Sequence, residues 1–327
     1  MLDRRTILTS VGSIGLASTV ATIGRRARAE TYPSRPITIV VPFTPGGNSD
    51  VAARIVGAKL QEIVGRTVIV VNRAGAGGII GGDYVNRSTP DGYTLLAASN
   101  GPLSLGPVFR KPPYDAQKDF APIGLISWTP EAIVAGAQFG PKTIAELIEY
   151  AKTKTVRAGT GGIETAPGIA LELFRLRTGI KVTEVVYAGA SLQYPPLMGG
   201  EIDIAVDQIS AAAPMSKGNA VRILAIADKT RSAMAPDVPT LKEAGVAEIV
   251  AGAYICLVAP AKAPPEIIAF LQTAFAKVMA SSDVRNHLIQ IGSVVPDDVS
   301  PAALLQTIAL DTDRAKAVAA ELKAKNG

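Results

Sequence analysis

The chain has 327 residues, 48% of them hydrophobic and only 5% aromatic, with a formal net charge of +5. That length exceeds what one hydrophobic core usually organises, and the excess of small aliphatic residues over rings suits buried parallel strands covered by alanine-rich helices. The positive charge comes almost entirely from residues 1–29, so the rest of the chain, with 28 basic and 27 acidic residues, excludes an extended basic surface for nucleic acid.

The first predicted element is an export signal over residues 1–29. Arg4-Arg5 precedes a weakly apolar stretch, Val11–Ile23, which is too short to span a bilayer comfortably. Ala27-Arg28-Ala29 then matches an A-x-A cleavage site and leaves Glu30 as the mature N-terminus. The paired arginines favour twin-arginine export, with Sec export or an uncleaved anchor helix as alternatives. Each of these places the mature protein outside the cytoplasm.

A first β-α-β-α-β run follows the leader. Its strands are continuously apolar, which predicts a parallel sheet with right-handed crossovers. The segments are a strand at 36–42, a glycine turn at 44–48, a helix at 49–64, a strand at 68–71, a glycine cluster at 75–82, a helix near 82–87 and a strand at 94–98.

A second run of the same kind comes next, and a tail completes the chain. The second run has strands at 132–135, 156–159, 182–186, 202–206 and 221–227, and helices at 143–154, 166–178, 191–198 and 211–217. The tail has a strand at 250–259 and helices at 265–280, 283–292 and 301–325.

Two runs and a tail predict two lobes. We expect the tail to return to the first lobe, so that residues 30–128 and 250–327 form lobe 1 and residues 129–249 form lobe 2. Two strand crossings between the lobes would then act as the hinge. The fold class is α/β, with a mostly parallel sheet flanked by helices in each lobe.

Few residues of this sequence are suited to catalysis or metal binding. The one histidine, His287, lies on an amphipathic helix, and the one cysteine, Cys256, lies in an apolar run that predicts a buried strand. One histidine and one cysteine cannot supply the ligands of a zinc site, and they do not suggest a catalytic Cys-His pair. We therefore expect that the protein binds no metal or cofactor and is not an enzyme. The cluster Gly75–Gly81 resembles a dinucleotide fingerprint, but Ile80 stands where that motif needs a glycine.

Three loops directly after predicted strands carry the candidate site, because open α/β sheets bind ligands at that edge. In two of them glycines allow close backbone approach, and the helix that follows directs free N–H groups and partial positive charge at the cleft. A routine helix cap is the alternative explanation for the acid and the asparagine of the first loop. The candidate residues are Phe43, Thr44, Pro45, Gly46, Gly47, Asn48 and Asp50 in the first loop, Ser99, Asn100 and Gly101 in the second, and Gly161, Gly162, Ile163, Glu164 and Thr165 in the third.

Motifs along the whole mature chain resemble the Bug-type substrate-binding proteins of tripartite tricarboxylate transporters. The resemblance implies a two-lobed periplasmic receptor of the Venus-flytrap type, a small organic carboxylate as ligand and membrane permease subunits as partners. It also implies that loops matching 44–48 and 161–165 hold the ligand carboxylate, often through water. The motifs are RPITIVVPF at 35–43 with Gly46-Gly47 and Asp50, NRAGAGG at 72–78, PDGYTL at 90–95, LELF at 171–174, YAGA at 187–190, GGEID at 199–203, VPTL at 238–241 with EAG at 243–245, and Ala259-Pro260.

The chain departs from that family before the second-lobe helix. The family usually carries a Ser/Thr-rich stretch followed by histidine there, whereas this chain has Gly168 at the histidine position. Glu164 repels a second carboxylate, meets a cationic group or faces solvent; the sequence leaves these options open. Asp207 matches a frequent family acid and either caps a helix or contacts the distal end of the ligand.

Two alternatives to a transport receptor remain at this stage. In the first, the closed protein docks on a sensor domain as a signalling module. In the second, the chain is an exported α/β enzyme, which the missing catalytic set argues against. For the receptor we expect a monomer without nucleic-acid partners.

Overall fold

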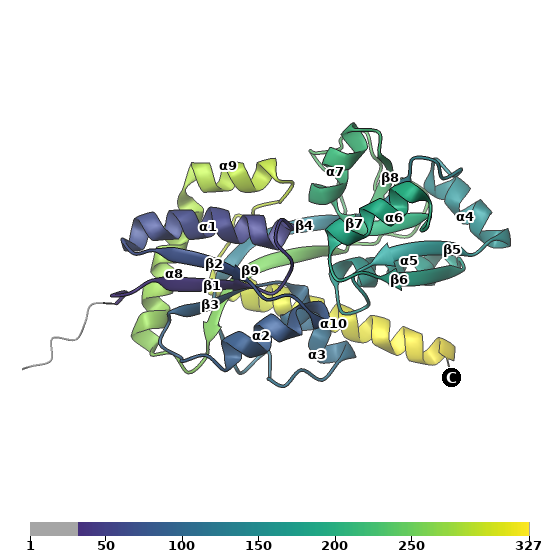
Figure 1. Ribbon diagram of the computed structural model, residues 1–327. Coiled ribbons are helices and arrows are strands. Elements are labelled where there is room, and N and C mark those ends of the chain that lie inside the picture. The colour runs from purple at the N-terminus through teal and green to yellow at the C-terminus, as the bar shows by residue number, and fades with distance from the viewer. Residues whose placement is uncertain (1–31, 327) are drawn as a thin grey trace, which may run out of the picture. The chain divides into compact units, whose positions relative to one another are not determined.

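The computed structural model describes residues 32–326, and the chain from Pro33 onward forms one compact unit (Figure 1). The predicted export signal at residues 1–29 lies outside the described residues, so its route and cleavage stay predictions. In the described part of the chain no single helix is long and apolar enough to cross a membrane, although the bent pair at 265–280 and 282–290 meets that test by length and composition alone.

The described residues contain nine strands. These are β1 (Ile37–Val41), β2 (Val68–Asn72), β3 (Thr94–Ala98), β4 (Phe120–Gly136), β5 (Val156–Thr160), β6 (Val182–Val186), β7 (Ile204–Gln208), β8 (Val221–Ile226) and β9 (Gly252–Pro260). They follow the hydrogen-bonded order β2-β1-β3-β9-β4-β7-β5-β6, and β8 pairs with β4 beside that path.

Helices cover this sheet in the described residues. They are α1 (Asn48–Val64), α2 (Ile79–Asn86), α3 (Gly106–Phe109), α4 (Ile144–Thr153), α5 (Ala166–Thr178), α6 (Tyr194–Gly199), α7 (Ile209–Lys217), α8 (Pro265–Ala280), α9 (Ser282–Gln290) and α10 (Pro301–Asn326), with short turns η1 (Ala76–Gly78), η2 (Gly101–Leu105) and η3 (Ala190–Leu192). Figure 1 shows α1 and α2 on opposite sides of β1, β2 and β3.

Strand pairing explains the two lobes. β1 pairs in parallel with β2 and β3, and β5 pairs in parallel with β6 and β7, as each β-α-β run predicts. Every pairing of β4 or β9 is antiparallel, because these two strands connect the runs. The fold is therefore a two-lobed α/β protein with antiparallel strands added to a parallel sheet in each lobe.

β4 belongs to both lobes. Its first part pairs with β9 as far as Pro130, and its second part pairs with β7 and β8 from Glu131 onward. The chain crosses back near Ala251, whose N–H donates to the Ala227 carbonyl at 2.9 Å. The change of partner at 130/131 lies two residues after the predicted lobe boundary at 128/129, and the boundaries at 128/129 and 249/250 stay a prediction.

The structure contains segments that the sequence did not predict. β4 begins at Phe120, twelve positions before the predicted strand at 132–135, and η2 and α3 lie where no helix was expected. Pro122 and Gly124 are residues that disfavour a strand, so the sequence did not predict one here. Register shifts on each side of Gly124 allow the β4–β9 pairing to continue past them.

Separate apolar cores support the lobes. Leu96, Cys256 and Val258 pack in the first, and Ile133, Phe174 and Ile204 pack in the second. Cys256 is a fully buried, free thiol in β9, which confirms the predicted strand residue. A smaller cluster spans both lobes, with Leu105 of η2, Ile169 of α5, and Ala315 and Val318 of α10.

Candidate ligand-binding site

The first-lobe glycine turn leads directly into the N-terminus of α1. Gly46 has a φ of +82°, which favours glycine, whereas Gly47 is extended at φ −74° and ψ 165° and precedes the first helical residue. The Val51 N–H closes the first helical turn on the Gly47 carbonyl at 3.0 Å. The N–H groups before Val51 have no acceptor within the helix, so this end of α1 presents donors and partial positive charge.

Asp50 holds this turn in place. The residue is 3% exposed. Its carboxylate accepts from the Gly46 N–H at 3.0 Å, from Arg54 Nε and Nη2 at 3.1 and 3.0 Å, and from Asn72 Nδ2 at 2.9 Å. Burial alone would raise the pKa of Asp50, but these hydrogen bonds and the charge of Arg54 outweigh it and lower that pKa. Asp50 is thus a positioning residue for the turn.

Asn48 connects the same turn to β4. Its Nδ2 donates to Thr129 Oγ1 at 2.8 Å, and Thr129 Oγ1 also lies 3.1 Å from Ser293 Oγ. Asn48 Oδ1 is buried and has no hydrogen-bond partner within the described residues. The start of α1 therefore reaches the strand that joins the two lobes.

The second-lobe glycine turn is fixed by its own polar groups. Gly162 has a φ of +90°, its N–H donates to Thr160 Oγ1 at 2.9 Å, and its carbonyl accepts from Thr165 Oγ1 at 2.7 Å. Thr165 caps α5 by accepting from the Gly168 N–H at 3.4 Å. This turn, like the first, leads directly into the N-terminus of a helix, where backbone N–H groups have no acceptor within the helix.

Gly168 departs from the resembled family for a steric reason. A Cβ built at Gly168 would overlap the carbonyl oxygen of Gly162. The turn at 161–165 therefore lies too close to α5 for any side chain at this position.

Glycines also mark where the lobes meet. A Cβ at Gly189 in the second lobe would lie 2.6 Å from Thr44 Oγ1 in the first. A Cβ at Gly77 would overlap the side chain of Glu164, and one at Gly101 would overlap the Gly77 carbonyl. The two lobes therefore approach each other closely around the glycine turns, where the side chains of Thr44 and Glu164 fill the space beside Gly189 and Gly77.

Glu164 meets a cation from the other lobe. Its side chain is 7% exposed, and its Oε1 lies 2.6 Å from Nη2 of Arg110, which follows α3. Of the three options that the sequence left open, the structure therefore selects pairing with a cationic group, and that group belongs to the chain itself. Glu164 joins the lobes at the edge of the site.

Neutralising Glu164 should weaken the lobe contact. We expect Glu164→Gln to lower ligand affinity about fivefold, because the closed form loses a contact worth ~1 kcal/mol after allowance for the half-exposed Arg110. Isothermal titration would measure this, with Glu149→Gln, which alters an exposed pair with Lys152, as the matched control. Unchanged affinity in Glu164→Gln would mean that the pair contributes nothing to closure.

The loop after β3 is packed inward. Asn100 is 2% exposed, and its Nδ2 donates to the Gly252 carbonyl at 3.2 Å and to Asp311 Oδ2 at 2.8 Å. Ser99 and Gly101 are also buried. The Asn100 amide thus links η2 to β9 and α10, and direct ligand contact by these three residues stays a prediction.

Asp207 lies at the end of β7 and is 3% exposed. Its Oδ1 accepts from the Gln208 N–H at 2.8 Å, whereas its Oδ2 has no hydrogen-bond partner in the described chain. Burial raises the pKa of Asp207 to about 6, against the lowering effect of the Gln208 N–H and the nearby Tyr194 and Gln193 side chains. Because Gln208, not Asp207, is the N-cap residue of α7, the capping alternative does not describe Asp207.

Glu131 is the acidic residue that the sequence analysis missed. It lies in β4 opposite Gln208, is fully buried, and neither carboxylate oxygen has a hydrogen-bond partner among the described residues. Burial, and next the charge of Asp207, raise the pKa of Glu131 well above its usual value. The sequence did contain an indication of it, since Glu131 is a single acidic residue between Pro130 and an apolar run. Burying an unpaired carboxylate costs free energy, so an acid in such a segment suggests a functional role.

The raised pKa of Glu131 predicts a pH-dependent stability. The folded protein keeps this proton while the unfolded chain releases it above about pH 4.5, so the free energy of unfolding should fall by ~1.4 kcal/mol per pH unit until the folded-state pKa is reached. Asp207 adds to this slope only below about pH 6.

Glu131→Gln should therefore become progressively more stable than the wild type between pH 6 and 8. Denaturant unfolding at several pH values would measure the difference. Glu201→Gln, at an exposed position of the same lobe, serves as the control and should show a constant difference. A constant difference for Glu131→Gln would mean that Glu131 is ionised in the folded protein.

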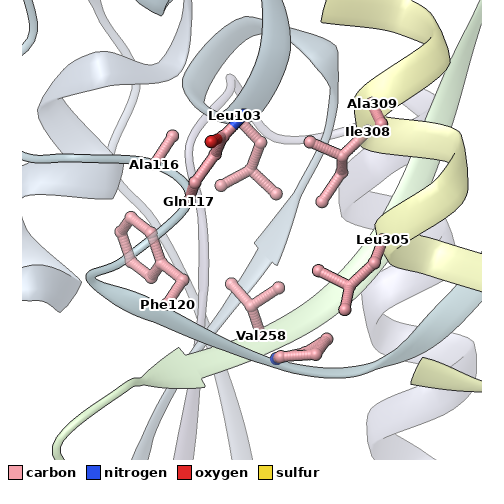
Figure 2. Close-up of a pocket in the computed structure, with 9 residues that line it drawn as sticks. Leu103, Ala116, Gln117, Phe120, Val258, Leu305, Ile308 and Ala309 are labelled. Carbon is pink, nitrogen blue, oxygen red and sulfur yellow. The ribbon is translucent and has the colours of Figure 1, made fainter. Parts of the chain in front are cut away.

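An apolar pocket lies away from these loops. Figure 2 shows Phe120 and Val258 on one side of it and Leu305 and Ile308 of α10 on the other. Gln117 supplies the polar group of the lining, and none of the predicted site residues contributes to it. This lining offers few donors for an anion, so the pocket is not our candidate site.

Comparison with known proteins matches the chain, over residues 52–323, to the family described as TctC, tripartite tricarboxylate transporter family receptor. Protein BugT of Bordetella pertussis is 34% identical over 275 residues, which cover 83% of this chain and 84% of that protein. MatC from Rhodopseudomonas palustris, solved with bound malate, is 31% identical with a TM-score of 0.82 and covers 88% of this chain and 99% of its own. Another R. palustris protein, solved with adipate, is 30% identical with a TM-score of 0.83 and covers 88% and 97%.

Proposed function

Because the chain belongs to the TctC family of tripartite tricarboxylate transporter receptors, we propose that it is a periplasmic solute-binding receptor that captures a small organic carboxylate between its two lobes. Membrane permease subunits would then accept the ligand. Malate and adipate, which the two related structures contain, are both small carboxylates, and this supports a ligand of the same chemistry here.

The observation that carries the proposal is the pair of glycine turns, one in each lobe, that open onto the N-termini of α1 and α5. Each helix end contributes ~0.3–1 kcal/mol to anion binding, and each charge-assisted hydrogen bond contributes ~1.5–3 kcal/mol. Several such bonds, less the cost of association, reach the ~8 kcal/mol of a micromolar complex. A ligand carboxylate that bridges both turns would favour the closed arrangement of the lobes.

We propose export and partner as parts of the same function. Residues 1–29 would direct the chain across the inner membrane and be removed after Ala29. N-terminal sequencing of periplasmic protein tests the cleavage, and a pull-down from membranes with ligand-loaded protein tests the permease. Recovery of a sensor protein instead of a permease would favour the signalling alternative.

Isothermal titration tests the central claim. The panel should include malate, adipate, aromatic carboxylates, monocarboxylates and amino acids, titrated into protein refolded to remove retained ligand. We expect at least one carboxylate to bind with a dissociation constant of about a micromolar. No binding across the panel would contradict a carboxylate receptor.

A further inference from the structure

One glycine of the second lobe lies directly against the first glycine turn. Gly189 follows β6 and precedes η3, and its φ lies outside the left-handed region, so its backbone does not require glycine. The three atoms nearest to a Cβ built at Gly189 all belong to Thr44 of the first lobe, with Oγ1 at 2.6 Å, Cγ2 at 3.5 Å and Cβ at 3.6 Å. The reason for a glycine at this position therefore lies in the other lobe.

Other glycines near the turns have additional reasons to be glycine. A Cβ at Gly77 would overlap the Glu164 side chain, but Gly77 also has a φ of +62°, which favours glycine by itself. Gly159, at the end of β5, is surrounded by side chains of its own lobe. Gly189 is thus a position where the contact between the lobes can be altered without straining the backbone.

The first-lobe side of this contact is anchored. Thr44 lies between two hydrogen-bonded points of the first glycine turn. The Phe43 carbonyl accepts from Asn72 Nδ2 at 3.1 Å, and the Gly46 N–H donates to the Asp50 carboxylate at 3.0 Å. The backbone of Thr44 therefore cannot move away from the second lobe without breaking one of these bonds.

The second-lobe side is anchored as well. The Tyr187 N–H donates to the Thr160 carbonyl at 2.8 Å, and the Gly189 carbonyl accepts from the Leu192 N–H at 3.1 Å. Hydrogen bonds thus hold the chain before and after the point of contact. Because both loops are fixed, the approach of Gly189 to Thr44 sets how far the two lobes can close.

This contact borders the place where we put the ligand carboxylate. The Thr44 carbonyl oxygen is the nearest atom to a Cβ at Gly47, at 3.7 Å, so Thr44 adjoins the free N–H groups at the start of α1. A ligand held by those groups extends from them toward the second lobe. The distance at which the second lobe stops therefore fixes the room that such a ligand has.

We propose that Gly189 is a specificity-determining residue, which lets the second lobe close onto Thr44 and thereby limits the length of the carboxylate that both glycine turns can hold. A side chain at position 189 would stop closure earlier, since its 2.6 Å approach to Thr44 Oγ1 is about 1 Å shorter than a normal contact. The wider space would suit a longer acid, and a short acid would lose a hydrogen bond to one turn. The inference rests on the proposed carboxylate-binding function and adds the determinant of ligand size.

Titration with two homologous series tests the inference. The series are the straight-chain dicarboxylates from succinate to suberate and the monocarboxylates from butyrate to octanoate. We expect the wild-type affinity to fall beyond one chain length. Gly189→Ala and Gly189→Val should lower the affinity for the best wild-type acid about threefold and about tenfold, and should move the optimum to an acid at least one methylene longer.

A matched control comes from the same lobe. Gly199 is exposed at the end of α6, and the nearest atom to a Cβ there is Glu201 Oε1 at 4.0 Å. Gly199→Val should therefore keep the wild-type order of affinities. Each variant should unfold within about 2 °C of the wild type in circular dichroism, which separates a change of binding from a loss of fold.

A double variant shows whether the effect acts through Thr44. Thr44→Ala removes the Oγ1 and Cγ2 atoms that a methyl group at position 189 would meet, and leaves Cβ at an ordinary 3.6 Å. Thr44→Ala alone is expected to change affinity, because Thr44 belongs to the turn, so Gly189→Ala is compared on that background. There it should no longer shift the preferred chain length. A shift of the same size in the double variant would contradict the inference.

The remaining outcomes separate the inference from the proposed function. The inference is wrong, while the carboxylate receptor stands, if the wild type shows no limit of chain length, or if Gly189→Val keeps the wild-type order or weakens all acids equally. If Gly189→Val unfolds, Gly189→Ala, which adds a single methyl group, decides in its place. If neither series binds to the wild type, the inference fails, and the wider panel of carboxylates decides whether the proposed function fails with it.

Discussion

Replacement of Gly47 by valine should abolish ligand binding while leaving the protein folded. The backbone at Gly47 is extended, a conformation that β-branched residues adopt readily, and the nearest atom to a Cβ there is the Thr44 carbonyl oxygen at an ordinary 3.7 Å. The Cβ of the added side chain therefore meets no protein atom closely. It would instead occupy the space in front of the free N–H groups of α1, where we place the ligand carboxylate.

The expected loss is at least about a hundredfold in affinity, because a carboxylate that cannot approach α1 forgoes one or more charge-assisted hydrogen bonds of ~1.5–3 kcal/mol each. Isothermal titration measures the affinity, and thermal unfolding should shift by no more than ~2 °C. Gly140→Val is the matched control, since Gly140 is exposed, has nothing within 4 Å of a Cβ and lies outside the site. Equal affinity in Gly47→Val and the wild type would refute this placement of the ligand.

Local chemistry made some of the fold predictable. The helix at 166–178 was predicted to the residue, because Thr165 caps its start and Gly179, at φ +69°, ends it. α1 was predicted within one residue for the same kind of reason, with Gly65 at φ +65° after its last turn. Helix ends whose signals lie within four residues in the sequence can be recognised without tertiary information.

Long-range pairing was harder to foresee. The first part of β4 contains Pro122, Gly124 and Pro130, which disfavour a strand locally, and it forms because β9 supplies an antiparallel partner from more than a hundred residues later. The inward role of the Asn100 amide also depends on a distant residue, Asp311 of α10. No window of sequence contains both partners of either contact.

In the candidate site, too, local features could be predicted from the sequence and long-range contacts could not. The glycine turns at 44–48 and 161–165 were recognisable because glycines, a hydroxyl residue and a helix start lie in sequence order. Glu131 was not, because its burial follows only from the pairing of β4 with strands that come much later in the chain. Arg110 was missed for a similar reason, since its pairing with Glu164 requires the two lobes to meet.

Asp50→Asn should produce the largest loss of stability among the variants considered. The carboxylate of Asp50 accepts from the Gly46 N–H, from Arg54 and from Asn72, and an amide would turn one acceptor into a donor that faces these donors. We expect the free energy of unfolding at neutral pH to fall by ~2–3 kcal/mol, and ligand affinity to fall with it because the glycine turn loses its anchor.

The pH dependence of that loss gives the sharper test. The folded-state pKa of Asp50 is lowered, so its contribution is present above the unfolded value of 3.8 and disappears as the pH falls through the lower folded value. The stability gap between wild type and Asp50→Asn should therefore narrow below about pH 4 in denaturant unfolding. Asp83→Asn, which alters the more exposed i,i+4 pair with Arg87, should cost under ~0.5 kcal/mol. If Asp50→Asn is as mild as Asp83→Asn, the turn holds its shape without the carboxylate, and the donors at the start of α1 are preorganised by the backbone alone.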